Sequence, residues 1–374
     1  FSSTLLTGGS NSIVLSTKII FSTNLTIVGL YNSTDTLYIS GGNNTGIFRI
    51  DNANKVYFDS IAIVNGLSDW GGAIRFNNSD SLFVHNSILR NNTAIQSGGA
   101  IHGANFLSLE NTIVTNNSAT FSGGGIHSNE VYINNSTITY NLAENTYGGG
   151  VYAHGTALVN NSIINNNQAE ERGGGIYVWN SNCNVNNSTI SNNTVVDNGG
   201  GIYSTWVFLD NSTVSNNTAN YGGGIDFIQL LVADNNTSIT NNTAAIDGGG
   251  IFTELSTDSI IVNNSTIDYN TANGKGGGIY AYESSGSLSS TWIKVNNSSI
   301  SNNTASWGGG IHTEAYFSAR FLIVIDNSTL NNNSSTTNAG GGIYSFASVT
   351  PSWVNVNNSS ISYNQAYSGG GIYS

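Results

Sequence analysis

The sequence predicts an all-β fold, a right-handed parallel β-helix (β-solenoid) of about 12 or more coils with roughly 25 residues each. Two motifs recur in step along the chain: a glycine cluster followed at once by a β-branched residue, and an aliphatic residue followed three positions later by Asn. Between the motifs, apolar and polar residues alternate in runs of four to seven, as in short strands. A unit this small cannot bury its own apolar side, so it must stack on copies of itself.

The glycine clusters predict the corners of the coils. Glycine permits positive φ and a close approach of backbones, which a sharp corner requires. Two short strands are expected after each corner; in one coil the first begins at Ile126 and the second runs over Val131–Ile133. Short parallel strands joined in the favoured right-handed sense give a solenoid. The branched residues that follow the clusters are Ile74, Ile101, Ile126, Val151, Ile176, Ile202, Ile225, Ile251, Ile279, Ile311, Ile343 and Ile372.

The second motif predicts a structural asparagine ladder. Stacked parallel strands place like residues about 4.8 Å apart. An Asn side chain in such a column can donate to one neighbouring coil and accept from the other. The aliphatic partners include Ile88, Ile113, Ile138, Ile163 and Ile190. The predicted ladder comprises Asn91, Asn116, Asn141, Asn166, Asn193, Asn217, Asn242, Asn270, Asn303, Asn333 and Asn364.

The regularity of the repeat predicts one β-helix over residues 1–374. Residues 1–66 are expected to form less regular first coils, 67–278 regular coils, and 279–374 coils with longer loop insertions. These insertions are expected at 281–292, 313–321 and 345–353. Because the chain contains no Met, we expect it to be part of a longer protein whose start and signal peptide are missing here.

The charge and composition of the chain exclude several classes of binding partner. The formal net charge is −12 with only 9 basic residues, which argues against nucleic acid and anionic membranes. No stretch approaches the roughly 20 apolar residues of a membrane span. Cys183 is the one cysteine, so no disulfide framework is expected. Asp and Glu are scattered, so we expect no catalytic residues, no metal site and no cofactor, and we predict that the chain is not an enzyme.

Sequons of the form Asn-x-Ser/Thr recur on positions expected to face outward. They predict an extracellular, N-glycosylated protein. The alternative is that Asn, Ser and Thr are simply favourable in ladders and corners, and the sequence leaves this open. The glycosylation candidates are Asn135, Asn160, Asn187, Asn192, Asn211, Asn216, Asn236, Asn241, Asn264, Asn297, Asn302, Asn327, Asn332 and Asn358.

A column of mostly aromatic residues follows the branched residues, and further aromatics lie in the insertions. We expect the column to point outward, where it could bind sugars or a neighbouring protein. The alternatives are mutual stacking that stiffens the sheet and loops that fold back on themselves. His102, His127 and His312 of this column lie on different coils and are not expected to bind metal. The candidate contact surface comprises Tyr152, Tyr177, Tyr203, Tyr280, Trp292, Phe321, Tyr344 and Trp353.

The paired signature GG[AG][IV] and [ILV]xxN resembles the GGAI/FxxN repeats of the chlamydial polymorphic outer membrane proteins. More broadly it is similar to the right-handed parallel β-helix (pectin-lyase-like) family. Residues 71–74 and 98–101 match GGAI letter for letter, and later coils use GGGI. The resemblance implies the fold strongly and the function weakly, since adhesins, lyases, hydrolases and fibre proteins share this fold.

These observations predict a non-catalytic structural protein of an extracellular fibre or cell surface. Its expected partners are other copies of itself, other surface or fibre proteins, and N-linked glycans. A carbohydrate-binding adhesin is the main alternative. An ice-binding protein is favoured by outward hydroxyl pairs such as Thr137/Thr139, although Leu89, Val114 and Ile164 are expected to interrupt them. A polysaccharide lyase or hydrolase would need carboxylates grouped in a groove.

Overall fold

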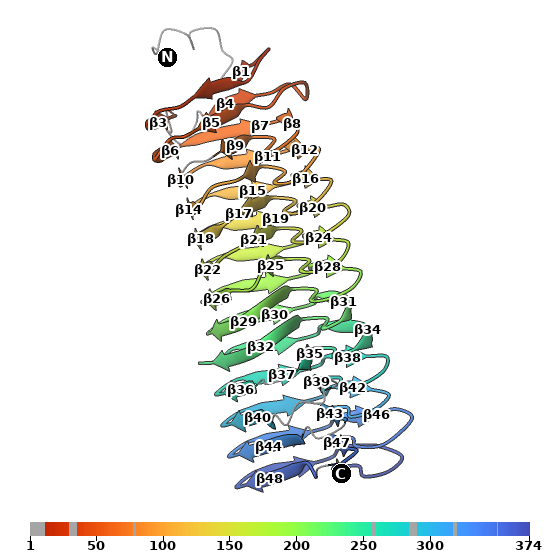
Figure 1. The fold of residues 1–374 in the computed structure, drawn as a ribbon. Coiled ribbons are helices and arrows are strands. Elements are labelled where there is room, and N and C mark those ends of the chain that lie inside the picture. The colour runs from red at the N-terminus through yellow and green to blue at the C-terminus, as the bar shows by residue number, and fades with distance from the viewer. Residues whose placement is uncertain are drawn as a thin grey trace. The chain divides into compact units, whose positions relative to one another are not determined.

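The chain is an all-β protein built from short parallel strands. The computed structural model describes residues 12–29, 36–77, 80–255, 259–283, 290–316, 320–349 and 351–374, and none of these lies in a helix. The chain divides into two compact units, residues 1–169 and 170–374, which are described in turn. In each unit, successive coils contribute strands to three parallel sheets, named here the flank, wide and narrow sheets (Figure 1). The wide sheet takes two strands from most coils.

The strands of the first unit fall into the three sheets as follows. The flank sheet contains β1 (Ser12–Val14), β4 (Leu37–Ser40), β7 (Ile61–Val64), β11 (Ile88–Arg90), β15 (Ile113–Thr115), β19 (Thr137–Thr139) and β23 (Ile163–Asn165). The wide sheet contains β2 (Ile19–Phe21), β3 (Leu25–Val28), β5 (Phe48–Asp51), β6 (Lys55–Asp59), β9 (Ile74–Asn77), β10 (Ser81–His85), β13 (Ile101–His102), β14 (Phe106–Glu110), β17 (Ile126–Ser128), β18 (Glu130–Asn134), β21 (Val151–Ala153) and β22 (Ala157–Asn160). The narrow sheet contains β8 (Leu67–Ser68), β12 (Thr93–Ala94), β16 (Ser118–Ala119), β20 (Leu142–Ala143) and β24 (Gln168–Ala169).

The second unit repeats this arrangement. The flank sheet contains β27 (Thr189–Ser191), β30 (Thr213–Ser215), β33 (Ser238–Thr240), β37 (Thr266–Asp268), β41 (Ser299–Ser301), β45 (Thr329–Asn331) and β49 (Ser360–Ser362). The wide sheet contains β25 (Ile176–Val178), β26 (Asn182–Asn186), β29 (Ile202–Asp210), β32 (Ile225–Asp234), β35 (Ile251–Leu255), β36 (Ser259–Asn263), β39 (Ile279–Glu283), β40 (Ser290–Asn296), β43 (Ile311–Ala315), β44 (Arg320–Asp326), β47 (Ile343–Ala347), β48 (Trp353–Asn357) and β50 (Ile372–Tyr373). The narrow sheet contains β28 (Thr194–Val195), β31 (Thr218–Tyr221), β34 (Thr243–Asp247), β38 (Thr271–Ala272), β42 (Thr304–Ala305) and β46 (Ser334–Ser335).

The core consists of columns of like residues, which confirms the predicted parallel β-solenoid. In the first unit, Ile101 pairs with Ile126 and Ile126 with Val151, and all three are fully buried. In the second unit, the flank sheet stacks Ile190 on Val214 and Val214 on Ile239, and these too are fully buried. Because side chains alternate along a strand, every second residue points into the core and stacks on its counterparts in neighbouring coils. Burial of this apolar surface is the main stabilising contribution.

An internal asparagine ladder runs beside the aliphatic columns. Asn217 is fully buried, and its Nδ2 donates to Oδ1 of Asn242 at 3.0 Å and to the carbonyl oxygen of Ile190 at 3.0 Å. Its own Oδ1 accepts from the backbone N–H and Nδ2 of Asn193. Every polar atom of the amide is therefore satisfied without water. The structure places this ladder at Asn141 in the first unit, and at Asn193, Asn217, Asn242, Asn270, Asn303, Asn333 and Asn364 in the second.

Three predicted ladder positions are wrong by one residue. Asn91, Asn116 and Asn166 lie at the corner with φ of 53–54°, and the buried ladder residues are the ones that follow them, Asn92, Asn117 and Asn167. The same shift corrects the aliphatic column, because Leu89, Val114 and Ile164 are fully buried while Ile113 and Ile163 are exposed. The prediction that these three residues interrupt an outward hydroxyl array is therefore wrong, because their side chains face the core.

The glycine corners allow neighbouring coils to approach at backbone distance. Gly123 has φ of +71°, and a Cβ on it would lie 2.3 Å from the carbonyl oxygen of Ile126. A Cβ on the next residue, Gly124, would lie 2.4 Å from the carbonyl oxygen of Gly149 in the following coil. The clusters are thus required both by the conformation of the turn and by the stacking of one turn on the next.

Parts of the expected irregular regions lie outside the described residues. In the first coils these are residues 1–11 and 30–35, and in the insertions they are 284–289, 317–319 and 350. The described first coils already pair in register, with Ile13 opposite Ile39 and Ile39 opposite Ile63.

Candidate functional site

The corner that precedes the flank sheet carries most of the predicted glycosylation sites. These Asn residues are exposed and have φ of 46–62°, a left-handed conformation that Asn tolerates better than most residues. The residues are Asn135, Asn187, Asn211, Asn236, Asn264, Asn297, Asn327 and Asn358. The corner that follows the flank sheet holds Asn192, Asn216, Asn241, Asn302 and Asn332, with φ of 55–56°.

Asn160 departs from the predicted column. It is the last residue of β22 and half-buried, and the corner position belongs to Asn161, with φ of 47°. The reason is the one-residue shift seen in the ladder, since Ile164 and not Ile163 is the inward residue of this coil.

The residue after each corner Asn supplies a buried hydroxyl ladder. The backbone N–H of Ser265 donates to Oγ of Ser298 at 3.1 Å, and the backbone N–H of Ser298 donates to Oγ of Ser328 at 3.0 Å. Most of these hydroxyls in turn donate to the carbonyl oxygen two residues earlier, as Ser298 does to Asn296 at 2.7 Å, while Thr237 donates three residues back to Asp234. The sequon pattern therefore has a structural origin: a left-handed Asn, an inward hydroxyl and an outward strand residue.

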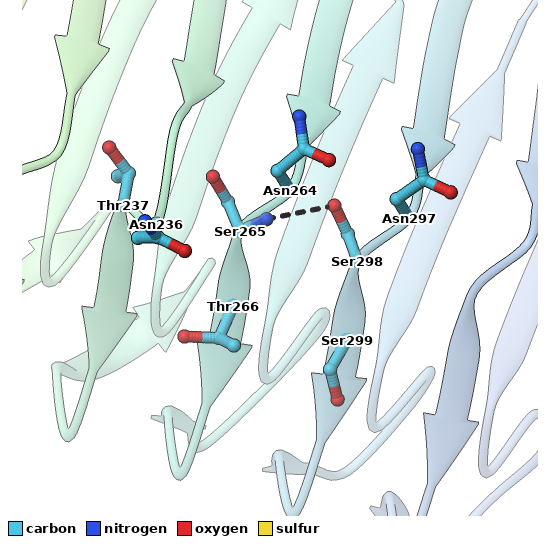
Figure 2. A pocket seen from close by; sticks show the side chains of 8 residues that line it. All are labelled: Asn236, Thr237, Asn264, Ser265, Thr266, Asn297, Ser298 and Ser299. Atoms are coloured by element: carbon cyan, nitrogen blue, oxygen red, sulfur yellow. Dashed lines mark hydrogen bonds between the residues drawn. The ribbon is translucent and has the colours of Figure 1, made fainter.

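A polar groove of about 460 Å³ lies along this corner in the second unit. Figure 2 shows the same set of amide, inward hydroxyl and strand hydroxyl repeated on neighbouring coils, with Ser265 and Ser298 joined by a hydrogen bond. Among the described residues, no charged side chain lines the groove, and the inward hydroxyls are engaged by the backbone. The exposed amides remain as its functional groups, and an amide is the attachment point of an N-linked glycan. The lining residues are Asn236, Thr237, Asn264, Ser265, Thr266, Asn297, Ser298 and Ser299.

The aromatic column is buried, which corrects most of the predicted contact surface. Rings of successive coils stack on one another: Tyr177 and Tyr203 have centroids 5.2 Å apart at 7°, and Tyr344 and Tyr373 have centroids 5.3 Å apart at 3°. In-register stacking covers much of each buried ring, so these side chains stiffen the sheet and expose little surface to a partner. The buried members of the predicted surface are Tyr152, Tyr177, Tyr203, Tyr280 and Tyr344.

The predicted aromatics of the later coils divide into two groups. Phe321 points into the core and is 1% exposed. Trp292 and Trp353 are 47% and 61% exposed and lie on either side of Leu322 in the register of β40, β44 and β48. Together with Arg320, whose guanidinium lies 6.0 Å from the Trp353 ring centroid, they line a small cavity of about 70 Å³.

The histidines of the column belong to the stack. The rings of His127 and Tyr152 are 4.5 Å apart and nearly parallel at 2°. Burial lowers the pKa of His102 to about 4 and that of His127 to about 3, and neighbouring positive charge adds to the effect. Both imidazoles are therefore neutral at physiological pH. Among the described residues, no group of three His, Cys, Asp or Glu side chains is arranged to hold a metal ion.

An acidic residue interrupts the aromatic column in the second unit. Asp226 stands between Tyr203 and Phe252 in the register, is 5% exposed, and accepts a 2.6 Å hydrogen bond from Nδ2 of Asn198. Burial raises the pKa of Asp226 to about 7, although the hydrogen bond and the charge of Arg172 oppose the rise. Asp226 is thus a buried carboxyl group whose charge changes near neutral pH.

Replacing Asp226 with Asn is expected to remove a pH-dependent loss of stability. The unfolded chain releases this proton near pH 3.8 and the folded chain near 7, so the wild type loses stability as pH rises across that interval. The loss is on the order of 4 kcal/mol as an upper bound. Urea unfolding at several pH values between 4 and 8 measures it, as the difference between wild type and Asp226→Asn. Parallel curves for the two proteins would contradict the assignment.

A second charged group ties neighbouring coils together. Nζ of Lys275 lies 2.6 Å from Oε2 of Glu314, and the hydroxyl of Tyr280 donates to the same oxygen at 2.9 Å. Burial and then the Glu314 charge raise the pKa of Tyr280. Because the Lys275 ammonium and the Tyr280 hydroxyl both bind the Glu314 carboxylate, these three residues link neighbouring coils. Cys183 is fully buried, and burial raises the pKa of its thiol to about 12, so it is not a reactive nucleophile.

A pocket of about 360 Å³ opens where the wide sheet of the second unit bends. Its aromatic residue Trp179 is 53% exposed, follows β25 and stacks on Tyr177 with ring centroids 6.4 Å apart. Sequence reasoning missed this pocket because Trp179 lies outside the repeating columns. The only available signal was an aromatic residue placed three positions after Ile176. The lining residues are Arg172, Tyr177, Val178, Trp179, Asn180, Tyr203, Thr205 and Ile228.

Comparison with known proteins supports the predicted family. Residues 127–293 match the family described as the right-handed β-helix region. Residues 297–314 match the repeat of the Chlamydia polymorphic membrane proteins. Searches of curated proteins and of solved structures gave no match. The predicted resemblance is confirmed over these residues. Among the described residues, no helix is long and apolar enough to cross a membrane.

Proposed function

We propose that the chain is a stiff, non-catalytic β-solenoid of an extracellular, surface-exposed protein, with a structural role. The observation that carries this proposal is the internal asparagine ladder, in which each buried amide bonds both neighbouring coils. Residues that form such ladders stabilise the stacking of the coils. Their polar atoms are already hydrogen-bonded, so they are not free to bind a ligand or to act in catalysis. The surface location is supported by the match of residues 297–314 to a repeat of surface-protein type.

N-linked glycans are the proposed modification of the corner asparagines. Their side chains are exposed at the corner that precedes the flank sheet, as at Asn264, Asn297 and Asn327. Adjacent coils bring these sites to about 4.8 Å spacing, so neighbouring sites cannot all carry large glycans. We expect partial or alternating occupancy.

End-to-end assembly is the proposed route to a fibre. Parallel strands at the edge of a solenoid present backbone N–H and C=O groups that can pair with another copy or with a related surface protein. The test pairs intact mass before and after enzymatic glycan removal with electron microscopy of the purified protein. A loss of mass and the appearance of filaments support the proposal. Release of oligosaccharides from an acidic polysaccharide would instead identify an enzyme and overturn it.

A carbohydrate-binding adhesin is the second candidate function. The observation that favours it is the pocket beside Trp179, which combines an exposed indole with a cation and a hydroxyl. The stacking of coils does not by itself require such a pocket, whereas ligand binding does.

A further inference from the structure

The pocket beside Trp179 gathers residues from three successive coils of the wide sheet. Residues 177–178 lie on β25 and 179–180 follow it. Tyr203 and Thr205 lie on β29, and Ile228 lies on β32. The register between β29 and β32 slips here, so that Ile228 and Gln229 stand opposite Thr205 alone. Such a bulge redirects side chains and often lies next to a binding site.

The walls of the pocket are mainly apolar and aromatic. Trp179 is 53% exposed and Ile228 is 43% exposed, so both present apolar surface to a ligand. The volume is within the range of small-ligand pockets. An exposed indole face offers a flat platform of the kind on which the apolar face of a sugar ring stacks.

The polar groups of the pocket include one that is buried without a partner. Thr205 is 1% exposed, and its hydroxyl is buried with no hydrogen-bond partner among the described residues. A buried hydroxyl without a partner costs free energy, and a ligand hydroxyl placed against it would remove that cost. Arg172 also lines the pocket, with its guanidinium 5.0 Å from the Tyr203 ring centroid and Nη1 donating to the Tyr203 hydroxyl at 3.3 Å.

The charges around the pocket argue against an acidic ligand. Glu170 and Glu171 precede Arg172 directly, and Asp226 interacts electrostatically with it. The guanidinium charge is therefore already offset locally, and the chain as a whole carries a formal charge of −12. A polyuronate would be repelled by this field, whereas an uncharged sugar would not.

We infer that this pocket binds a neutral pyranose unit of an uncharged glycan, with the sugar face on Trp179 and a sugar hydroxyl on Thr205. The inference deepens the adhesin candidate and is independent of filament formation. The probes are neutral and uronate-containing oligosaccharides on an array, followed by titration calorimetry with the neutral oligosaccharides that bind.

Three variants of the full chain test the assignment. Trp179→Ala is expected to weaken binding about tenfold through the lost stacking. Thr205→Val keeps the shape of the side chain and is expected to weaken binding about threefold to tenfold through the lost hydrogen bond. Trp353→Ala removes an exposed indole elsewhere and should leave the affinity within about twofold. Unchanged circular dichroism spectra and melting temperatures no lower than that of the wild type confirm that the variants fold.

The outcomes separate this site from the wider function. Absence of binding to every neutral glycan, preference for uronates, or full affinity in Trp179→Ala would overturn the site. If Trp353→Ala loses binding while Trp179→Ala retains it, the adhesin function stands and only the pocket is misassigned.

Discussion

Replacing Asn217 with Leu is expected to lower the free energy of unfolding by about 4 kcal/mol or more. The substitution removes the acceptor for two donors of Asn193, the backbone N–H and Nδ2. It also removes the Nδ2 donor to the carbonyl oxygen of Ile190, whereas Oδ1 of Asn242 keeps the backbone N–H of Asn217 as a donor. All of these groups lie in the interior, where a polar group without a partner costs about 1–3 kcal/mol. Urea unfolding followed by circular dichroism measures the change.

The adjacent Asn216 provides the matched control for this prediction. It is exposed at the corner with φ of 55°, a conformation that glycine adopts freely. Asn216→Gly is therefore expected to change the free energy of unfolding by less than about 1 kcal/mol. Both proteins are best produced in a host without N-glycosylation, because Asn216 begins a sequon. Similar losses for Asn217→Leu and Asn216→Gly would show that the buried ladder is not the source of cohesion.

The ladder also shows how far the sequence determines this fold. The repeat period and the two motifs are sufficient to predict parallel stacking, and the aliphatic columns follow from alternation. The register within a coil is ambiguous where two aliphatic residues and two Asn residues stand side by side. In the coil with Ile113, Val114, Asn116 and Asn117, either pair keeps the spacing of three. Only the corner geometry, which places one Asn at positive φ, decides that Asn117 faces inward.

The aromatic column could not be placed correctly by alternation alone. Alternation indicates on which side of a strand a residue lies, and it correctly separates Tyr177 from the inward Ile176. It does not indicate whether neighbouring coils cover that side. Ring stacking across coils buries Tyr177 and Tyr203 even though they lie on the outer face. The pocket at Trp179 escaped prediction for the same reason, because it depends on a bend and a register slip that leave no periodic mark.

A methyl group at Gly124 is expected to disrupt the first unit, with a loss of about 3 kcal/mol or more in the free energy of unfolding. A Cβ there would lie 2.3 Å from the carbonyl carbon of Leu142, 2.5 Å from its oxygen, and 2.4 Å from the carbonyl oxygen of Gly149. All three atoms belong to the backbone of the next coil, so they cannot move without opening the stack. Thermal unfolding of Gly124→Ala by circular dichroism measures the loss.

Gly155→Ala is the control, because a Cβ at Gly155 would meet the flexible side chain of Glu130 at 3.2 Å as its nearest contact. Its expected cost in the free energy of unfolding is below about 1 kcal/mol.

The sequence itself shows which glycine position tolerates a methyl group. The third position of the glycine cluster is Ala73 in one coil and Ala100 in the next, whereas the second position is Gly72 and Gly99. A methyl group is therefore compatible with stacking at the third position, and the constraint lies in the second. Equal stability of Gly124→Ala and Gly155→Ala would refute close backbone contact as the reason for the repeat.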